Sequence, residues 1–141
     1  MTARRLFSYW PKWAFSVTVF AAILWLTLAP EPLPDEGLVF FPGIDKIVHA
    51  CLFGGMAFAL LFDLALARYK RHKAAPWRFS WKQLLVVVLT DCLFGAAIEL
   101  AQSAMGMGRA AEIADFLADG AGALLAVLIS PFILRCIFRT R

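Results

Sequence analysis

Polar and ionisable residues occur at helical spacing inside three apolar segments of this chain. The eight residues with useful chemistry are Asp45, Lys46, His49, Glu99, Gln102, Arg109, Asp115 and Asp119. Asp45 and His49 are four residues apart, as are Asp115 and Asp119, so each pair shares one face of a helix. An imidazole and carboxylates can move protons, and the basic side chains can pair with an anion. The set predicts a polar pocket that binds or processes a charged ligand.

His49, Glu99 and Asp119 are the candidate catalytic residues, because an imidazole beside carboxylates can act as a general acid and base. A divalent cation is an alternative, since one histidine with several carboxylates suits a hard or borderline metal. Lys46 and Arg109 weigh against a metal because they can neutralise the same acids by ion pairing. The sequence contains no GxSxG or HExxH motif and no motif that predicts a cofactor. Whether the chain is an enzyme, and whether it binds a metal, stays open.

Some of these residues also have ordinary structural explanations. Asp45 and Asp115 stand at expected helix starts, where an aspartate caps the helix or complements its dipole. Lys46, taken singly, is typical of a lysine that anchors a helix at the membrane interface. Four others lie a turn or more inside, where hydrogen bonds between helices are the simpler alternative to a ligand: His49, Glu99, Gln102 and Asp119. Two further acids, Asp63 and Asp91, lie apart from the set and are expected to pair locally.

Composition places these segments in a membrane. The chain has 141 residues, of which 62% are hydrophobic and 17% charged, whereas a soluble domain carries about a quarter charged residues. Spans of roughly 20 apolar residues are long enough to cross a bilayer. We expect an all-α integral membrane protein with a single domain over residues 1–141. It forms a four-helix bundle with transmembrane helices at about 13–29, 45–67, 82–105 and 113–138. We expect the first to be an uncleaved helix rather than a signal peptide.

The distribution of Lys and Arg orients the bundle. Twelve of the 14 lie in the N-terminal segment, the 68–82 loop and the tail, and the opposite loops hold only Lys46 and Arg109. This asymmetry predicts a bacterial inner-membrane protein with both termini in the cytoplasm and the pocket at the outer face. The basic clusters flank apolar runs and form no basic face, so we expect membrane lipids rather than nucleic acid as partners.

Small residues recur every four positions in the last segment, at Ala114, Ala118, Gly122, Ala126 and Ser130. Such a stripe allows close approach of another helix, and Gly54, Gly55 and Ala59 offer the same in the second segment. The three cysteines form no CxxC pair and predict neither a disulfide framework nor a zinc site.

The ordered motifs Asp45-Lys46-x-x-His49, Glu99-x-x-Gln102, Arg109 and Asp115-x-x-x-Asp119-x-x-Gly122 resemble those of VanZ-like membrane proteins. The resemblance covers roughly residues 45–125. Two positions depart from the family pattern: Asp119 stands where an asparagine is usual, and the 103–108 loop lacks the proline common before the arginine.

VanZ itself is associated with low-level teicoplanin resistance, and most relatives have no assigned activity. The resemblance therefore implies a protein that binds or modulates an envelope lipid or a lipid-linked cell-wall precursor, with a link to glycopeptide resistance. A membrane-embedded enzyme that uses His49 with Glu99 or Asp119 on a lipid-linked substrate is the first alternative. The second is a structural or assembly partner of a membrane complex, which would use the small-residue stripe.

Overall fold

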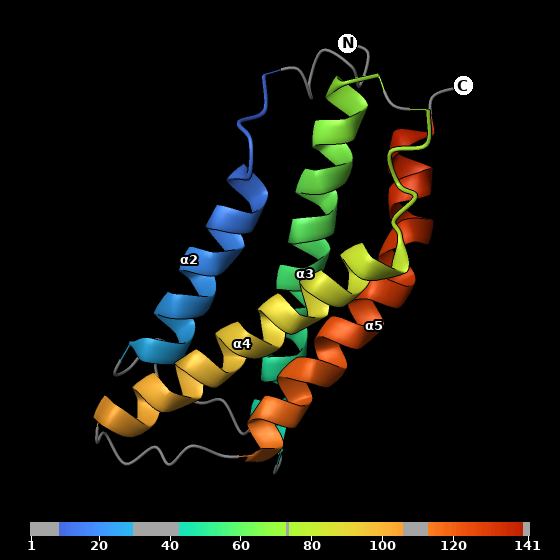
Figure 1. Cartoon of the computed structure of the whole chain (residues 1–141). Helices are drawn as coiled ribbons and strands as arrows, with labels where there is room; N and C mark the ends of the chain where they lie inside the picture. The colour runs from blue at the N-terminus through green and yellow to red at the C-terminus, as the bar shows by residue number, and fades with distance from the viewer. Residues whose placement is uncertain (1–8, 30–42, 73, 106–112, 140–141) are drawn as a thin grey trace.

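The computed structural model describes residues 9–29, 43–72, 74–105 and 113–139, and this part of the chain contains four helices and no strand. The helices are α2 (Ala14–Leu28), α3 (Ile44–Lys70), α4 (Trp81–Met105) and α5 (Ile113–Phe138). Figure 1 shows α2, α3 and α5 running roughly along one axis, with α4 crossing the bundle obliquely. The predicted all-α architecture is confirmed for this part of the chain.

Three of the helices are long and apolar enough to cross a membrane. α3, α4 and α5 have 27, 25 and 26 residues, which at about 1.5 Å per residue exceeds a hydrocarbon core of about 30 Å. α2 has 15 residues and is shorter than the predicted 13–29 span. α3 continues past the predicted residue 67 to Lys70, because basic residues in its last turn complement the helix dipole.

Side-chain hydrogen bonds cap the N-termini of two of the helices, one from nearby residues and one from another helix. Ser80 and Gln83 form a reciprocal capping box before α4: the Ser80 N–H donates to Gln83 Oε1 at 2.9 Å, and the Gln83 N–H donates to Ser80 Oγ at 3.4 Å. α2 is capped from another helix, because the Ser16 N–H and hydroxyl both donate to Asp63 Oδ2, at 2.8 and 2.7 Å. The acid in α3 thus fixes the start of α2.

α3 and α5 make the closest packing, at glycines. A Cβ added to Gly122 would lie 2.1 Å from the carbonyl oxygen of Ala50, and one added to Gly54 would lie 3.1 Å from that of Gly122. The backbones touch here, so the predicted small-residue stripe is used in part within the chain itself. Within the stripe, Ser130 is also buried, whereas Ala114 at its other end is exposed.

The two ends of the bundle differ in charge. One end holds the start of α2 and the ends of α3 and α5, and the loop that leads to α4 leaves from it (Figure 1). We call it the basic end, after Lys12, Lys70, Arg71, Arg135 and Arg139. The opposite end, where α2 and α4 finish and α3 and α5 begin, carries the predicted pocket, and we call it the polar end. Large apolar side chains such as Leu93, Leu128 and Phe132 are exposed between the two ends, as expected of a surface that faces lipid.

Candidate functional site

A histidine–aspartate pair between α3 and α5 lies at the centre of the polar end. His49 Nδ1 lies 2.9 Å from Asp119 Oδ1, 70 residues away in sequence. The Asp119 side chain is 1% exposed and that of His49 12%. The pair lies next to the closest helix crossing, since Ala50 follows His49 and Gly122 is three residues beyond Asp119. Backbone contact between the two helices therefore sets the position of the pair.

The other oxygen of Asp119 is held against α4. A Cβ added to Gly95 would lie 2.6 Å from Asp119 Oδ2, so any larger residue at position 95 would require this carboxylate to shift. Asp119 Oδ2 is buried and accepts no hydrogen bond from the described residues. An acceptor left this way inside a bundle is costly, and a ligand donor, a water or a proton would satisfy it.

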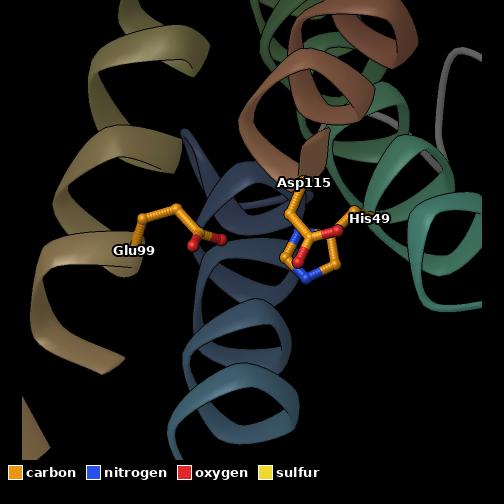
Figure 2. Close-up of side chains that lie close together, drawn as sticks. All are labelled: His49, Glu99 and Asp115. Carbon is orange, nitrogen blue, oxygen red and sulfur yellow. The ribbon is translucent and has the colours of Figure 1, made fainter. Parts of the chain in front are cut away.

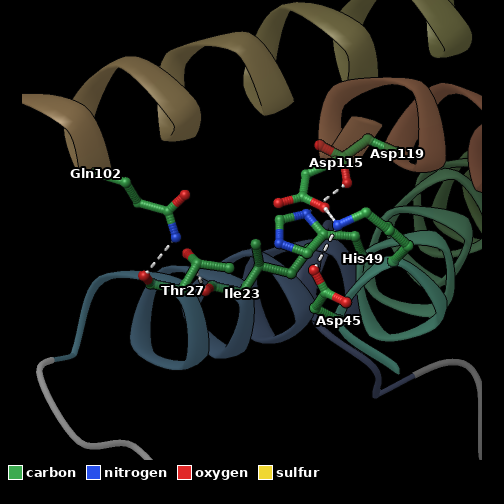
Figure 3. Close-up of polar contacts among 8 residues, drawn as sticks. Ile23, Thr27, Asp45, His49, Gln102, Asp115 and Asp119 are labelled. Carbon is green, nitrogen blue, oxygen red and sulfur yellow. Dashed lines mark hydrogen bonds and ion pairs between the residues drawn. The ribbon is translucent and has the colours of Figure 1, made fainter. Parts of the chain in front are cut away.

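A lysine joins the two aspartates nearest the rim of this end. Lys46 Nζ lies 2.6 Å from Asp45 Oδ2 and 3.1 Å from Asp115 Oδ1. The side chains of Asp45 and Asp115 are 50% and 14% exposed, so one arm of this network faces outward and the other faces the pocket (Figure 3). The positive charge of Lys46 therefore offsets the negative charges of both aspartates. Adjacency in the sequence makes the pair with Asp45 easy to predict, whereas the pair with Asp115 depends on the packing of α3 on α5.

His49, Glu99 and Asp115 converge from three different helices. Each offers one atom able to bind a metal, and the three atoms lie within 4.8 Å of one another. Glu99 is 6% exposed, and its carboxylate points from α4 toward the imidazole and Asp115 (Figure 2). Ligand atoms around one divalent cation are separated by similar distances. The donor set fits a hard or borderline metal, although Lys46 competes for Asp115.

One of the predicted pocket residues, Gln102, makes its hydrogen bond outside this group. Gln102 Nε2 donates to the carbonyl oxygen of Thr27 at 2.9 Å, and so joins α4 to the end of α2 (Figure 3). That carbonyl is among the last of its helix, where an external donor satisfies it. Arg109 lies outside the described residues. Among the residues that the structure describes, the site comprises Asp45, Lys46, His49, Glu99, Asp115 and Asp119.

Asp91 is a buried acid that the sequence pattern predicts to lie apart from the pocket. It is 1% exposed, and it lies one turn before Gly95, where α4 packs against the Asp119 carboxylate. Neither carboxylate oxygen of Asp91 makes a hydrogen bond within the described residues. Asp91, Gly95 and Glu99 are spaced by four, which places them on one face of α4. That spacing is the signal that could have connected Asp91 to the site.

The arrangement suits two kinds of chemistry. An imidazole held by a buried carboxylate has a fixed ring orientation, so it can bind a ligand or transfer a proton through its other nitrogen. The Lys46 ammonium beside several acids can bind an anionic group and hold a polar substituent next to it.

Comparison with known proteins gives one family. The family model described as VanZ/LLP1 matches residues 3–135, nearly the whole chain. Neither the curated proteins nor the solved structures yield a match.

Proposed function

Because the chain belongs to the VanZ/LLP1 family of membrane proteins, we propose that it binds the head group of an envelope lipid or lipid-linked cell-wall precursor at the polar end. The observation that carries the proposal is the convergence of four ionisable side chains from three membrane helices: His49, Glu99, Asp115 and Asp119. Glu99 and Asp119 are buried, and the side chains of His49 and Asp115 are only 12% and 14% exposed. Ionisable groups inside a membrane bundle are expensive, which favours a functional role for them.

The charges indicate how such a head group lies. The Lys46 ammonium meets the anionic part, such as a phosphate, and gives up part of its pairing with Asp45 or Asp115. Hydroxyl or amine substituents then donate to the carboxylates of Glu99 and Asp119. The positive-inside pattern supports an outer-face location, and hence a ligand drawn from the outer leaflet.

Substitution within the pocket tests this proposal. His49→Ala, Glu99→Gln and Asp119→Asn, each at unchanged membrane abundance, should weaken binding of the lipid-linked precursor by tenfold or more. They should also remove any effect of the protein on teicoplanin susceptibility. Ser130→Ala is the matched control, since Ser130 is a buried polar residue whose hydroxyl donates to Ala126 of its own helix at 2.5 Å. Unchanged binding and susceptibility in all three pocket variants would refute the proposal.

Catalysis on the bound lipid is a second candidate, and the His49–Asp119 contact favours it. A buried carboxylate bonded to Nδ1 fixes the ring so that Nε2 exchanges protons, while Glu99 can act as the complementary acid or base. A divalent cation held by His49, Glu99 and Asp115 would supply a Lewis acid at the same place.

Two measurements separate these possibilities from binding alone. Turnover of a lipid-linked substrate by the purified protein should fall at least a hundredfold in His49→Ala if catalysis occurs. Elemental analysis that finds no stoichiometric divalent metal in protein purified without chelator would end the metal version. Tight binding without turnover would leave the binding function and end the enzyme candidate.

A further inference from the structure

A cavity at the basic end of the bundle lies far from the site proposed above. It has a volume of about 210 Å³ and is lined by Pro11, Lys12, Trp13, Asp63, Leu66, Ala67, Lys70 and Arg71. A volume of this size holds more than a single water molecule. The walls combine cations, an acid and apolar side chains, which is unusual for a simple packing defect.

Asp63, the acid in this cavity, uses only one of its two carboxylate oxygens in hydrogen bonds within the described residues. Asp63 is 3% exposed, and its Oδ2 accepts both hydrogen bonds from Ser16. Its Oδ1 is buried and accepts no hydrogen bond from the described residues. Capping of α2 thus explains one oxygen of Asp63 and leaves the other as an acceptor in the cavity wall.

The cations lie around the opening. Lys12 and Arg71 are exposed, and Lys70 Nζ donates to the carbonyl oxygen of Trp10 at 2.6 Å. Trp10 and Trp13 are 41% and 49% exposed, as is typical of indoles at a membrane interface. The cavity therefore opens at the depth where phospholipid phosphates lie.

We propose that this cavity binds the head group of a phospholipid with a primary ammonium, its phosphate toward Lys12 and Arg71 and its ammonium toward Asp63 Oδ1. The charge order carries the assignment: a phosphate beside Asp63 would be repelled, whereas a donor there completes the unsatisfied acceptor. Leu66 and Ala67 of α3 give the acyl chains an apolar wall. Lipid bound here would tie α2 to α3 at the inner face that the basic residues predict.

Native mass spectrometry of the full-length protein in detergent tests the assignment. Phosphatidylethanolamine should be retained about tenfold more strongly than phosphatidylcholine, which has no N–H to donate, or phosphatidylglycerol, which has no cation. Asp63→Asn keeps an oxygen for Ser16 and presents an amide in place of the acceptor, so it should abolish this preference. Soluble phosphoethanolamine is the competitor that distinguishes a lipid from a free phosphate ester, and full displacement by it would overturn the lipid source.

Exposed cations provide variants that do not depend on the buried acid. Lys12→Gln and Arg71→Gln should each weaken phosphatidylethanolamine binding severalfold, whereas Lys82→Gln, at an exposed cation of α4 outside the cavity, should not. Equal binding of the three lipids, or loss of equal size in the Lys82 variant, would overturn the proposal. The pocket variants at the polar end should leave this binding unchanged, so the two proposals fail independently.

Discussion

The closest backbone contact in the bundle predicts how much a single methyl group would disturb the site. In Gly122→Ala the new Cβ would lie 2.1 Å from the carbonyl oxygen of Ala50, and ordinary contact begins near 3.4 Å. α3 and α5 must therefore move apart by about 1.3 Å at this point. Overpacking of this kind costs about 1–3 kcal/mol, which outweighs the gain of up to about 1 kcal/mol from replacing glycine in a helix.

Gly55→Ala is the matched control, since a Cβ there meets no atom within 4 Å. We expect it to be neutral or to stabilise the protein by up to about 1 kcal/mol. The helix-propensity gain is the same in both variants, so unfolding in the same detergent, followed by circular dichroism, should separate them by the overpacking cost of about 1–3 kcal/mol. Equal stability of the two would refute the close packing of α3 on α5.

The same substitution should also disturb the polar end. Since Ala50 follows His49 directly, a separation of about 1.3 Å would stretch the 2.9 Å contact between His49 Nδ1 and Asp119 Oδ1 beyond hydrogen-bond length. Nitrogen chemical shifts of the His49 ring should report this change in Gly122→Ala and not in Gly55→Ala. Unchanged shifts would show that the crossing does not position the pair.

Three further predictions concern other contacts. Gly95→Ala should displace the Asp119 carboxylate, from which its Cβ would lie 2.6 Å, and reduce precursor binding about as much as Asp119→Asn; normal binding would contradict this. Ser16→Ala removes one of two hydrogen bonds to Asp63 and should lower unfolding free energy by about 1.5–3 kcal/mol, measured by the same detergent unfolding. A reporter that is active only in the cytoplasm should give a signal when it is fused within the 68–82 loop. A signal there from a reporter that is active only outside the cytoplasm would reverse the predicted orientation.

Much of the polar end could be predicted because helical spacing is a local property. Asp45 with His49, and Asp115 with Asp119, occupy one face of a helix whatever surrounds them. A bilayer further restricts where charged residues occur, so their clustering toward one end follows from hydropathy and the loop charges. The three long apolar helices were predicted for the same reason.

Contacts between helices were harder to predict, since they depend on rotation and tilt. Gln102 was expected in the pocket, but the oblique path of α4 turns it toward Thr27 of α2. Asp91 was placed apart, yet its spacing of four from Gly95 puts it on the α4 face that meets Asp119. Asp63 was expected to pair locally, and instead accepts two hydrogen bonds from Ser16, 47 residues away at the start of α2.

Composition and the order of the polar motifs were enough to predict a membrane protein with the VanZ-like pattern. Hydropathy and residue spacing are local properties of each segment and do not depend on how the helices pack. Tertiary structure alone decided which carboxylate meets His49 and why Gly95 and Gly122 have no side chain. Those facts depend on how closely two helices approach and at what angle they cross. Sequence periodicity specifies the face that a helix presents, but packing against its neighbours determines what that face touches.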